Sequence, residues 1–164
     1  DGERARTELQ AIQTISRQAL ADMREAVIGL RGRKLGDAMR ESVQRLADAG
    51  VAAELEGEGD TDSLSDSAST ALAMVTREAV TNIIRHANAS RAKLGFFRQD
   101  DAVRLMIRDN GRGGADPNGG GLSGLRARLE GLGGALEVGS VNRDEGTLLT
   151  ARLPDQAECE GQSQ

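Results

Sequence analysis

The chain of 164 residues has very few aromatic side chains: Phe96 and Phe97 are its only two, and it contains no tryptophan or tyrosine. Cysteine and histidine occur once each, so the chain can form no internal disulfide and offers no Cys/His cluster for zinc. Its net charge of −5 and its lack of stacking platforms argue against nucleic-acid binding. Its apolar runs are too short to span a bilayer. We therefore expect a cytoplasmic chain with no direct nucleic-acid or membrane contact.

Residues 3–31 contain no proline, and no glycine before Gly29. They predict one long N-terminal helix with a heptad seam. We favour a dimerising helix over one that packs on its own domain, because the segment is long and lies outside the compact pattern that follows. Because residue 1 is aspartate rather than methionine, we expect a fragment of a longer protein. The predicted heptad seam consists of Leu9, Ile12, Ser16, Ala19, Met23, Ala26 and Leu30.

The remainder of the chain alternates helical and strand patterns. Because several strands follow one another directly, we predict a two-layer α+β sandwich whose sheet is mixed and largely antiparallel, with helices on one face. The pattern divides the chain into residues 1–34 (helix of a dimerisation domain), 35–154 (a compact domain) and 155–164 (a disordered tail). The predicted helices span about 35–49, 67–88 and 122–132, and the predicted strands about 51–55, 91–98, 102–108, 135–141 and 147–153.

The third predicted helix carries a polar stripe beside its apolar face. Glu78, Asn82 and His86 lie four residues apart and therefore fall on one side of an α-helix. A carboxylate and an amide oxygen suit a magnesium–phosphate site, because Mg²⁺ prefers oxygen ligands, and Glu78 could accept a proton. Taken alone, the stripe favours a solvated helix face, with Arg77 and Arg85 alongside.

Two glycine-rich segments follow. Asp109-Asn110-Gly111-Arg112-Gly113-Gly114 comes directly after a strand, where its glycines could admit a ligand, although Asn-Gly is also typical of a hairpin turn. Residues 119–124 match the G-x-G-x-x-G pattern at a helix start, which is a ready anion site. We reject the dinucleotide-binding interpretation because a loop precedes this pattern and a hairpin follows it, but keep phosphate binding.

In combination, these motifs form a specific set. Glu-x-x-x-Asn-x-x-x-His, Asp-Asn-Gly-Arg-Gly, Gly-x-Gly-Leu-x-Gly-Leu and Gly146-Thr147, in this order, resemble the ATP-binding catalytic domain of two-component sensor histidine kinases. That domain belongs to the superfamily of gyrase, MutL and the heat-shock chaperone ATPases, so the resemblance implies a Bergerat-type ATP-binding fold. Residues 77–87 resemble the N box of the DesK/NarL-type subgroup, and residues 3–31 its second dimerisation helix.

The resemblance implies roles at the phosphate end of ATP. Asn82 would ligate the Mg²⁺ that bridges the phosphates, and Glu78 would be the catalytic base or water organiser. Arg85 and His86 would lie near the phosphates. The helix start that faces the phosphates would comprise Gly119, Gly121, Leu122 and Gly124.

The resemblance also implies roles at the adenine end. Asp109 would accept a hydrogen bond from the adenine amine, and Thr147 would join it through water. Gly111 and Gly113 would make room for the base, and residues 114–120 would form a short lid over the nucleotide.

His86 is the sole histidine and lies in the N box, so we expect the phosphoacceptor histidine upstream of residue 1. The expected function is transfer of the γ-phosphoryl of Mg-ATP to that histidine and then to an aspartate of a NarL-type response regulator, within a homodimeric protein. Two alternatives are a serine kinase of the anti-sigma-factor type and a non-enzymatic nucleotide-gated dimer. The long leading helix argues against the first, and the intact Glu78, Asn82 and Asp109 argue against the second.

Overall fold

The computed structural model describes residue 16 and residues 34–57, 59–113, 120–142 and 145–155. The chain divides into two units, Asp1–Arg33 and Lys34–Gln164, and the account that follows concerns the second. The predicted helix and heptad seam at 3–31 therefore lie outside the described residues, apart from Ser16. Gly119, nearly all of the predicted lid and the predicted tail beyond residue 155 also lie outside them.

The described unit contains three α-helices, one π-helical turn and five strands, close to the predicted spans. Each predicted helix and strand of residues 35–154 has a counterpart within two residues at its N-terminal end, because the apolar spacing specifies each element. The helical elements are α2 (Leu35–Asp48), α3 (Asp66–Asn82), η1 (Ile83–Ala87) and α4 (Gly120–Gly131). The strands are β1 (Ala52–Glu56), β2 (Arg91–Gln99), β3 (Ala102–Asp109), β4 (Ala135–Asn142) and β5 (Glu145–Pro154).

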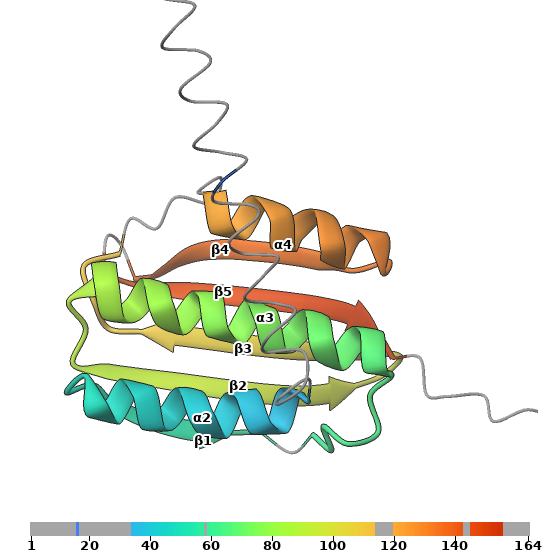
Figure 1. Ribbon diagram of the computed structural model, residues 1–164, viewed down its shortest axis with the longest axis horizontal. Coiled ribbons are helices and arrows are strands. Elements are labelled where there is room, and N and C mark those ends of the chain that lie inside the picture. Colours follow the sequence, from blue (N-terminus) through green and yellow to red (C-terminus); the bar gives the residue numbers. More distant parts are fainter. Residues whose placement is uncertain (1–15, 17–33, 58, 114–119, 143–144, 156–164) are drawn as a thin grey trace, which may run out of the picture. The chain divides into compact units, whose positions relative to one another are not determined.

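The five strands form one sheet in the order β1-β2-β3-β5-β4. β1 pairs with β2 in parallel, and the other three pairings are antiparallel. Figure 1 shows α2, α3 and α4 together against one face of the sheet. This arrangement confirms the predicted two-layer α+β fold with a mixed, largely antiparallel sheet.

α3 occupies the middle of the helical layer (Figure 1), and its position explains its wide buried surface. It contacts α2 on one side and α4 on the other, and it also packs on β3 and β5. Leu72, Val75 and Val80 are completely buried there, with Leu94 and Leu105 of the sheet beneath them. Because α3 is held on three sides, the polar residues at its C-terminal end have a well-defined place relative to the sheet.

Hydrogen bonds at the N-terminal end of α3 fix its start. The hydroxyl of Ser65 caps the helix by accepting a hydrogen bond from the backbone N–H of Ala68 at 3.3 Å. The backbone N–H of Leu35 donates to the buried hydroxyl of Ser69 at 2.9 Å, which joins the start of α2 to the same end of α3. The opposite end of α3 carries the predicted site residues.

Candidate functional site

Glu78 and Asn82 lie one helical turn apart near the C-terminal end of α3, and both are half-buried. Neither side chain makes a hydrogen bond or an ion pair with any residue that the structure describes. Their oxygen atoms are therefore available to a ligand or a cation, which agrees with the chemistry that the stripe predicts.

His86 does not continue the stripe of Glu78 and Asn82 as α-helical spacing predicts. The helix predicted over 67–88 ends as an α-helix at Asn82, and η1 is a π-helical turn over Ile83–Ala87. A π-helical turn rotates less per residue than an α-helix, so a spacing of four no longer keeps residues in line. Arg85 and His86 are both exposed on this turn, while Ala87 is buried at its end.

Asp109 ends β3 and points toward the helical layer. It is 6% exposed, which is unusual for a carboxylate, and one of its oxygens, Oδ1, accepts a hydrogen bond from the backbone N–H of Gly111 at 2.7 Å. The other oxygen, Oδ2, makes no hydrogen bond within the described part of the chain. A buried carboxylate with one oxygen held and the other available is well suited to accept a hydrogen bond from a ligand amine.

Three segments far apart in the sequence meet beside Asp109. The backbone N–H of Arg112 donates to the carbonyl of Ala87 at 2.9 Å, and the backbone N–H of Gly146 donates to the carbonyl of Gly111 at 2.7 Å. A Cβ on Gly111 would collide with the carbonyl of Ala87, so only glycine allows this close approach. The end of η1, the loop after β3 and the start of β5 are thereby joined; we call this the Ala87–Gly111–Gly146 junction.

The segment after β3 is not the hairpin turn that Asn-Gly also suggested. β3 pairs with β2 and β5, and the chain after Gly113 leads to α4 rather than back along β3. The Asn110 side chain instead bonds the segment before β2: its Oδ1 accepts from the backbone N–H groups of Ser90 and Arg91 at 3.0 and 2.8 Å. No local sequence signal predicts this role of Asn110, because the bonds join segments 19 and 20 residues apart.

α4 begins against the polar stripe of α3. A Cβ on Gly121 would collide with the carboxylate of Glu78, so the two helices are in contact where the predicted phosphate site lies. Leu122 is 4% exposed and belongs to the core, which leaves only its backbone for ligand contact. Gly124 faces open space. Gly113 and Thr147 are half-buried, the latter on β5 opposite Ser140 of β4.

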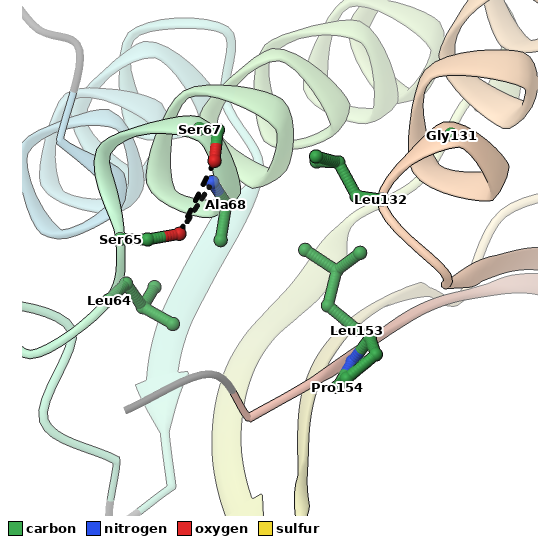
Figure 2. Close-up of a pocket in the computed structure, with 8 residues that line it drawn as sticks. All are labelled: Leu64, Ser65, Ser67, Ala68, Gly131, Leu132, Leu153 and Pro154. Carbon is green, nitrogen blue, oxygen red and sulfur yellow. Dashed lines mark hydrogen bonds between the residues drawn. The ribbon is translucent and has the colours of Figure 1, made fainter. Parts of the chain in front are cut away.

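The structure therefore brings most of the predicted site to one end of the sheet. In Figure 1 the C-terminal end of α3, the end of β3 and the start of α4 lie at this end. A cavity of about 170 Å³ lies at the opposite end, between the start of α3, the end of α4 and the end of β5 (Figure 2). Its lining, which includes Leu64, Leu132 and Leu153, contains none of the predicted site residues and no titratable group.

Among the described residues, no group of three or more His, Cys, Asp or Glu side chains could hold a metal ion. A cation bound at Asn82 would therefore need oxygen ligands from the nucleotide phosphates or from water. No helix in the described part of the chain combines the length and apolar character that crossing a membrane requires.

Two glycines of the site allow a matched test. Gly111→Ala is expected to lower the free energy of unfolding by about 1–3 kcal/mol, because the carbonyl of Ala87 is backbone and cannot move aside easily. Gly121→Ala is expected to cause no loss, because the flexible Glu78 side chain can move. Urea unfolding measures both, with Gly124→Ala as the control for helix propensity. A Gly111→Ala variant as stable as the original chain would contradict the described junction.

Solved structures with the same fold belong to histidine kinases. The histidine kinase domain of the blue-light activated kinase from Erythrobacter litoralis EL346 aligns with a TM-score of 0.57 and 22% identity, over 74% of this chain and 61% of that chain. The catalytic domain of the histidine kinase ThkA aligns with a TM-score of 0.57 and 17% identity, over 74% and 94% of the two chains. At these identities the likeness concerns the fold alone.

Sequence relatives are sensor kinases. Sensor histidine kinase YvfT of Bacillus subtilis is 32% identical over 157 residues, which cover 94% of this chain and 41% of the relative. The histidine-protein kinase/phosphatase UhpB of Salmonella typhimurium is 33% identical over 88% and 30% of the two chains. Sensor histidine kinase DesK of B. subtilis is 30% identical over 159 residues, which cover 94% of this chain and 42% of the relative. The chain thus spans about two fifths or less of the length of these relatives.

The family match covers most of the described unit. Residues 37–158 match the family described as the histidine kinase-like ATPase domain, and this segment contains the polar stripe of α3, the Ala87–Gly111–Gly146 junction and α4. It also begins within α2 and therefore leaves out the segment before residue 34. The chain belongs to the histidine kinase-like ATPase domain family.

Proposed function

We propose that this chain binds Mg-ATP at the Ala87–Gly111–Gly146 junction and serves as the ATP-binding catalytic part of a sensor histidine kinase. The observation that carries the proposal is Asp109, a carboxylate that is 6% exposed and has one oxygen free of hydrogen bonds to described residues. It lies at the same end of the sheet as the free oxygens of Glu78 and Asn82 and the start of α4.

Asp109 recognises the adenine in this proposal. Its free Oδ2 accepts the hydrogen bond that the exocyclic amine of adenine donates, and a guanine carbonyl at that place would offer no donor. Gly111 and Gly113 carry no side chain that would exclude the base. Thr147 lies near the start of β5, at the end of the sheet where β3 ends at Asp109. Its hydroxyl can hold a bridging water.

The phosphates lie toward α3 and α4 in this proposal. The backbone N–H groups at the start of α4, near Gly121, favour negative charge through their hydrogen-bonding capacity and the helix dipole. Asn82 supplies an amide oxygen to the metal, and Arg85 and His86 on η1 add positive or polar groups nearby. A bound Mg²⁺ would neutralise charge on the transferring phosphoryl group.

Glu78 is proposed to organise the nucleophile. It contacts Gly121 at the start of α4, where the γ-phosphoryl would lie, and its carboxylate has no partner among the described residues. In phosphoryl transfer the protein mainly positions reactants and stabilises charge, so a single base near the nucleophile suffices.

The acceptor in this proposal is a histidine outside these 164 residues. His86, the sole histidine of the chain, lies on η1 among the proposed ATP-contacting residues. The phosphoryl group then passes to an aspartate of a response regulator of the NarL type, and the segment 3–31 contributes to a dimer interface. The relatives named as sensor histidine kinases support this assignment.

Asp109→Asn tests adenine recognition without removing the bond to Gly111, because an asparagine oxygen can still accept it. The amide nitrogen would then face the adenine amine. The affinity for a non-hydrolysable ATP analogue, measured by calorimetric titration, is expected to fall by about tenfold or more, the equivalent of one lost hydrogen bond to a charged group. Asp101→Asn, in the exposed β2–β3 turn, is the control. Unchanged affinity in Asp109→Asn, or equal binding of a GTP analogue by the original chain, would refute the assignment.

Asn82→Ala tests the metal role. The original chain is expected to bind the ATP analogue more tightly with Mg²⁺ than with EDTA, and the variant is expected to lose this difference because it lacks the amide oxygen. Gln44→Ala provides an amide control on α2, where the Gln44 side chain bonds Asp48. If Asn82→Ala retains the full dependence on Mg²⁺, Asn82 is not the ligand.

The phosphorylated product separates the two kinase classes. In the protein that contains this chain, label from γ-labelled ATP is expected to be acid-labile, as phosphohistidine is, and to be absent in Asp109→Asn. The 164-residue chain alone is expected to retain no label. Acid-stable label would favour the serine kinase alternative. Label on the isolated chain that disappears in His86→Gln would identify His86 as the acceptor instead.

A further inference from the structure

The sheet face opposite the helices carries a group of cationic side chains. Strand alternation places Arg91 and Lys93 of β2, Arg104 and Arg108 of β3, and Arg152 of β5 on this outer face. The three helices of the described unit all lie on the other face (Figure 1). The same alternation places Glu54 and Glu56 of β1 and Glu137 of β4 on this face, so the five cations exceed the carboxylates there although the chain as a whole has a net charge of −5.

Most of these cations lack an acidic partner. Lys93 pairs with Glu54 and Glu56 of β1 at 3.2 and 3.5 Å, whereas the four arginines make no ion pair within the described residues. Arg104 lies directly opposite Arg152, and Lys93 directly opposite Arg108. Like charges in such positions destabilise a sheet, and of these five cations only Lys93 has an acidic partner among the described residues. An anion bound to the arginines would therefore relieve repulsion that the sheet itself does not compensate.

One end of the outer face is hollowed into a pocket of about 280 Å³. Arg91, Lys93 and Arg108 line it, together with Asn110 and the half-exposed Val141 of β4. Arg104 and Arg152 are not part of its lining. The pocket therefore gathers three of the five cations into a concave site, where an anion is less screened by water than on a flat surface.

Arg91 and Arg108 are the two pocket cations available to a ligand. They lie on adjacent antiparallel strands as a diagonal pair, two residues apart in register, so both side chains are on the same face. Each guanidinium presents a planar set of donors, and two such groups from different strands can bind different oxygens of one tetrahedral anion. A phosphate group fits this arrangement better than a planar carboxylate, which a single guanidinium can satisfy.

The pocket is held in shape by Asn110. Its Oδ1 accepts from the backbone N–H of Arg91 at 2.8 Å, which fixes the start of β2 relative to the end of β3. Asp109 also contributes to the pocket wall, although its carboxylate faces the helical layer and bonds Gly111. The pocket thus lies behind the candidate nucleotide site, on the other face of the same strand ends.

We propose that this pocket is a second anion site that binds a phosphate group, either free phosphate or a phosphomonoester, through Arg91 and Arg108. It lies on the opposite face of the sheet from the nucleotide site of the proposed function, and the only residue that the two share is Asp109, whose carboxylate faces the helical layer.

The test is an amide NMR titration of the chain with inorganic phosphate and, in a second arm, O-phosphoserine, at constant ionic strength. Saturable shifts are expected at residues 91–93, 108–110 and 141. Arg108→Gln is expected to weaken this binding by about tenfold, as the loss of a charge-assisted hydrogen bond predicts, and Arg91→Gln similarly. Arg104→Gln, an exposed arginine on the same strand and face but outside the pocket, is the matched control and is expected to bind normally.

Four results would overturn the proposal. If Arg104→Gln and Arg108→Gln weaken phosphate binding equally, the shifts report general surface charge and not a site. A shift response that does not saturate would lead to the same conclusion. Acetate acting as strongly as phosphate would exclude a phosphate site. Shifts confined to the start of α4, near Gly121, would place the phosphate at the nucleotide site alone. Tighter binding of phosphoserine than of phosphate would identify a phosphomonoester as the ligand, and the reverse would identify free phosphate.

Discussion

The hydrogen bond from the Arg112 N–H to the Ala87 carbonyl is the contact on which the rest of the site depends. It joins the end of the helical layer to the loop that leaves the sheet after β3. Gly111 permits the contact because it has no Cβ, and the Gly146 N–H then binds the Gly111 carbonyl. Asp109, beside this junction, is thereby held close to the helix that bears Glu78 and Asn82.

Strand alternation gives the end of β3 two different roles. Asp109 points into the helical layer and is buried, whereas Arg108 points to the outer face and is exposed. Asn110 then bonds the backbone before β2 and so stabilises the strand ends that both faces share. The two faces of the sheet therefore share one short segment, residues 108–110, at this end.

Local spacing predicted the elements well because each one buries a regular apolar face. The buried Leu35, Met39 and Leu46 of α2 and the alternating Val103, Leu105 and Ile107 of β3 are examples. The π-helical end of α3 was missed, since i→i+5 bonding leaves no pattern that distinguishes Ile83–Ala87 from an α-helix. Motif order predicted a set of site residues, and the structure brings several of them, among them Glu78, Asn82 and Asp109, to one end of the sheet. The role of Asn110 and the contact of Gly121 with Glu78 needed tertiary structure, because both join segments distant in sequence.

The central claim is that a nucleotide binds at the Asp109 end of the sheet. Amide hydrogen exchange of the chain, with and without a Mg²⁺-bound ATP analogue, tests it most directly. We predict slower exchange in the nucleotide complex at Ala87, at residues 109–113, at the start of α4 and at residues 146–147, because these backbone groups surround the proposed ligand. Protection confined to the cavity at Leu64, Leu132 and Leu153, or no protection at a saturating concentration of the analogue, would contradict the account.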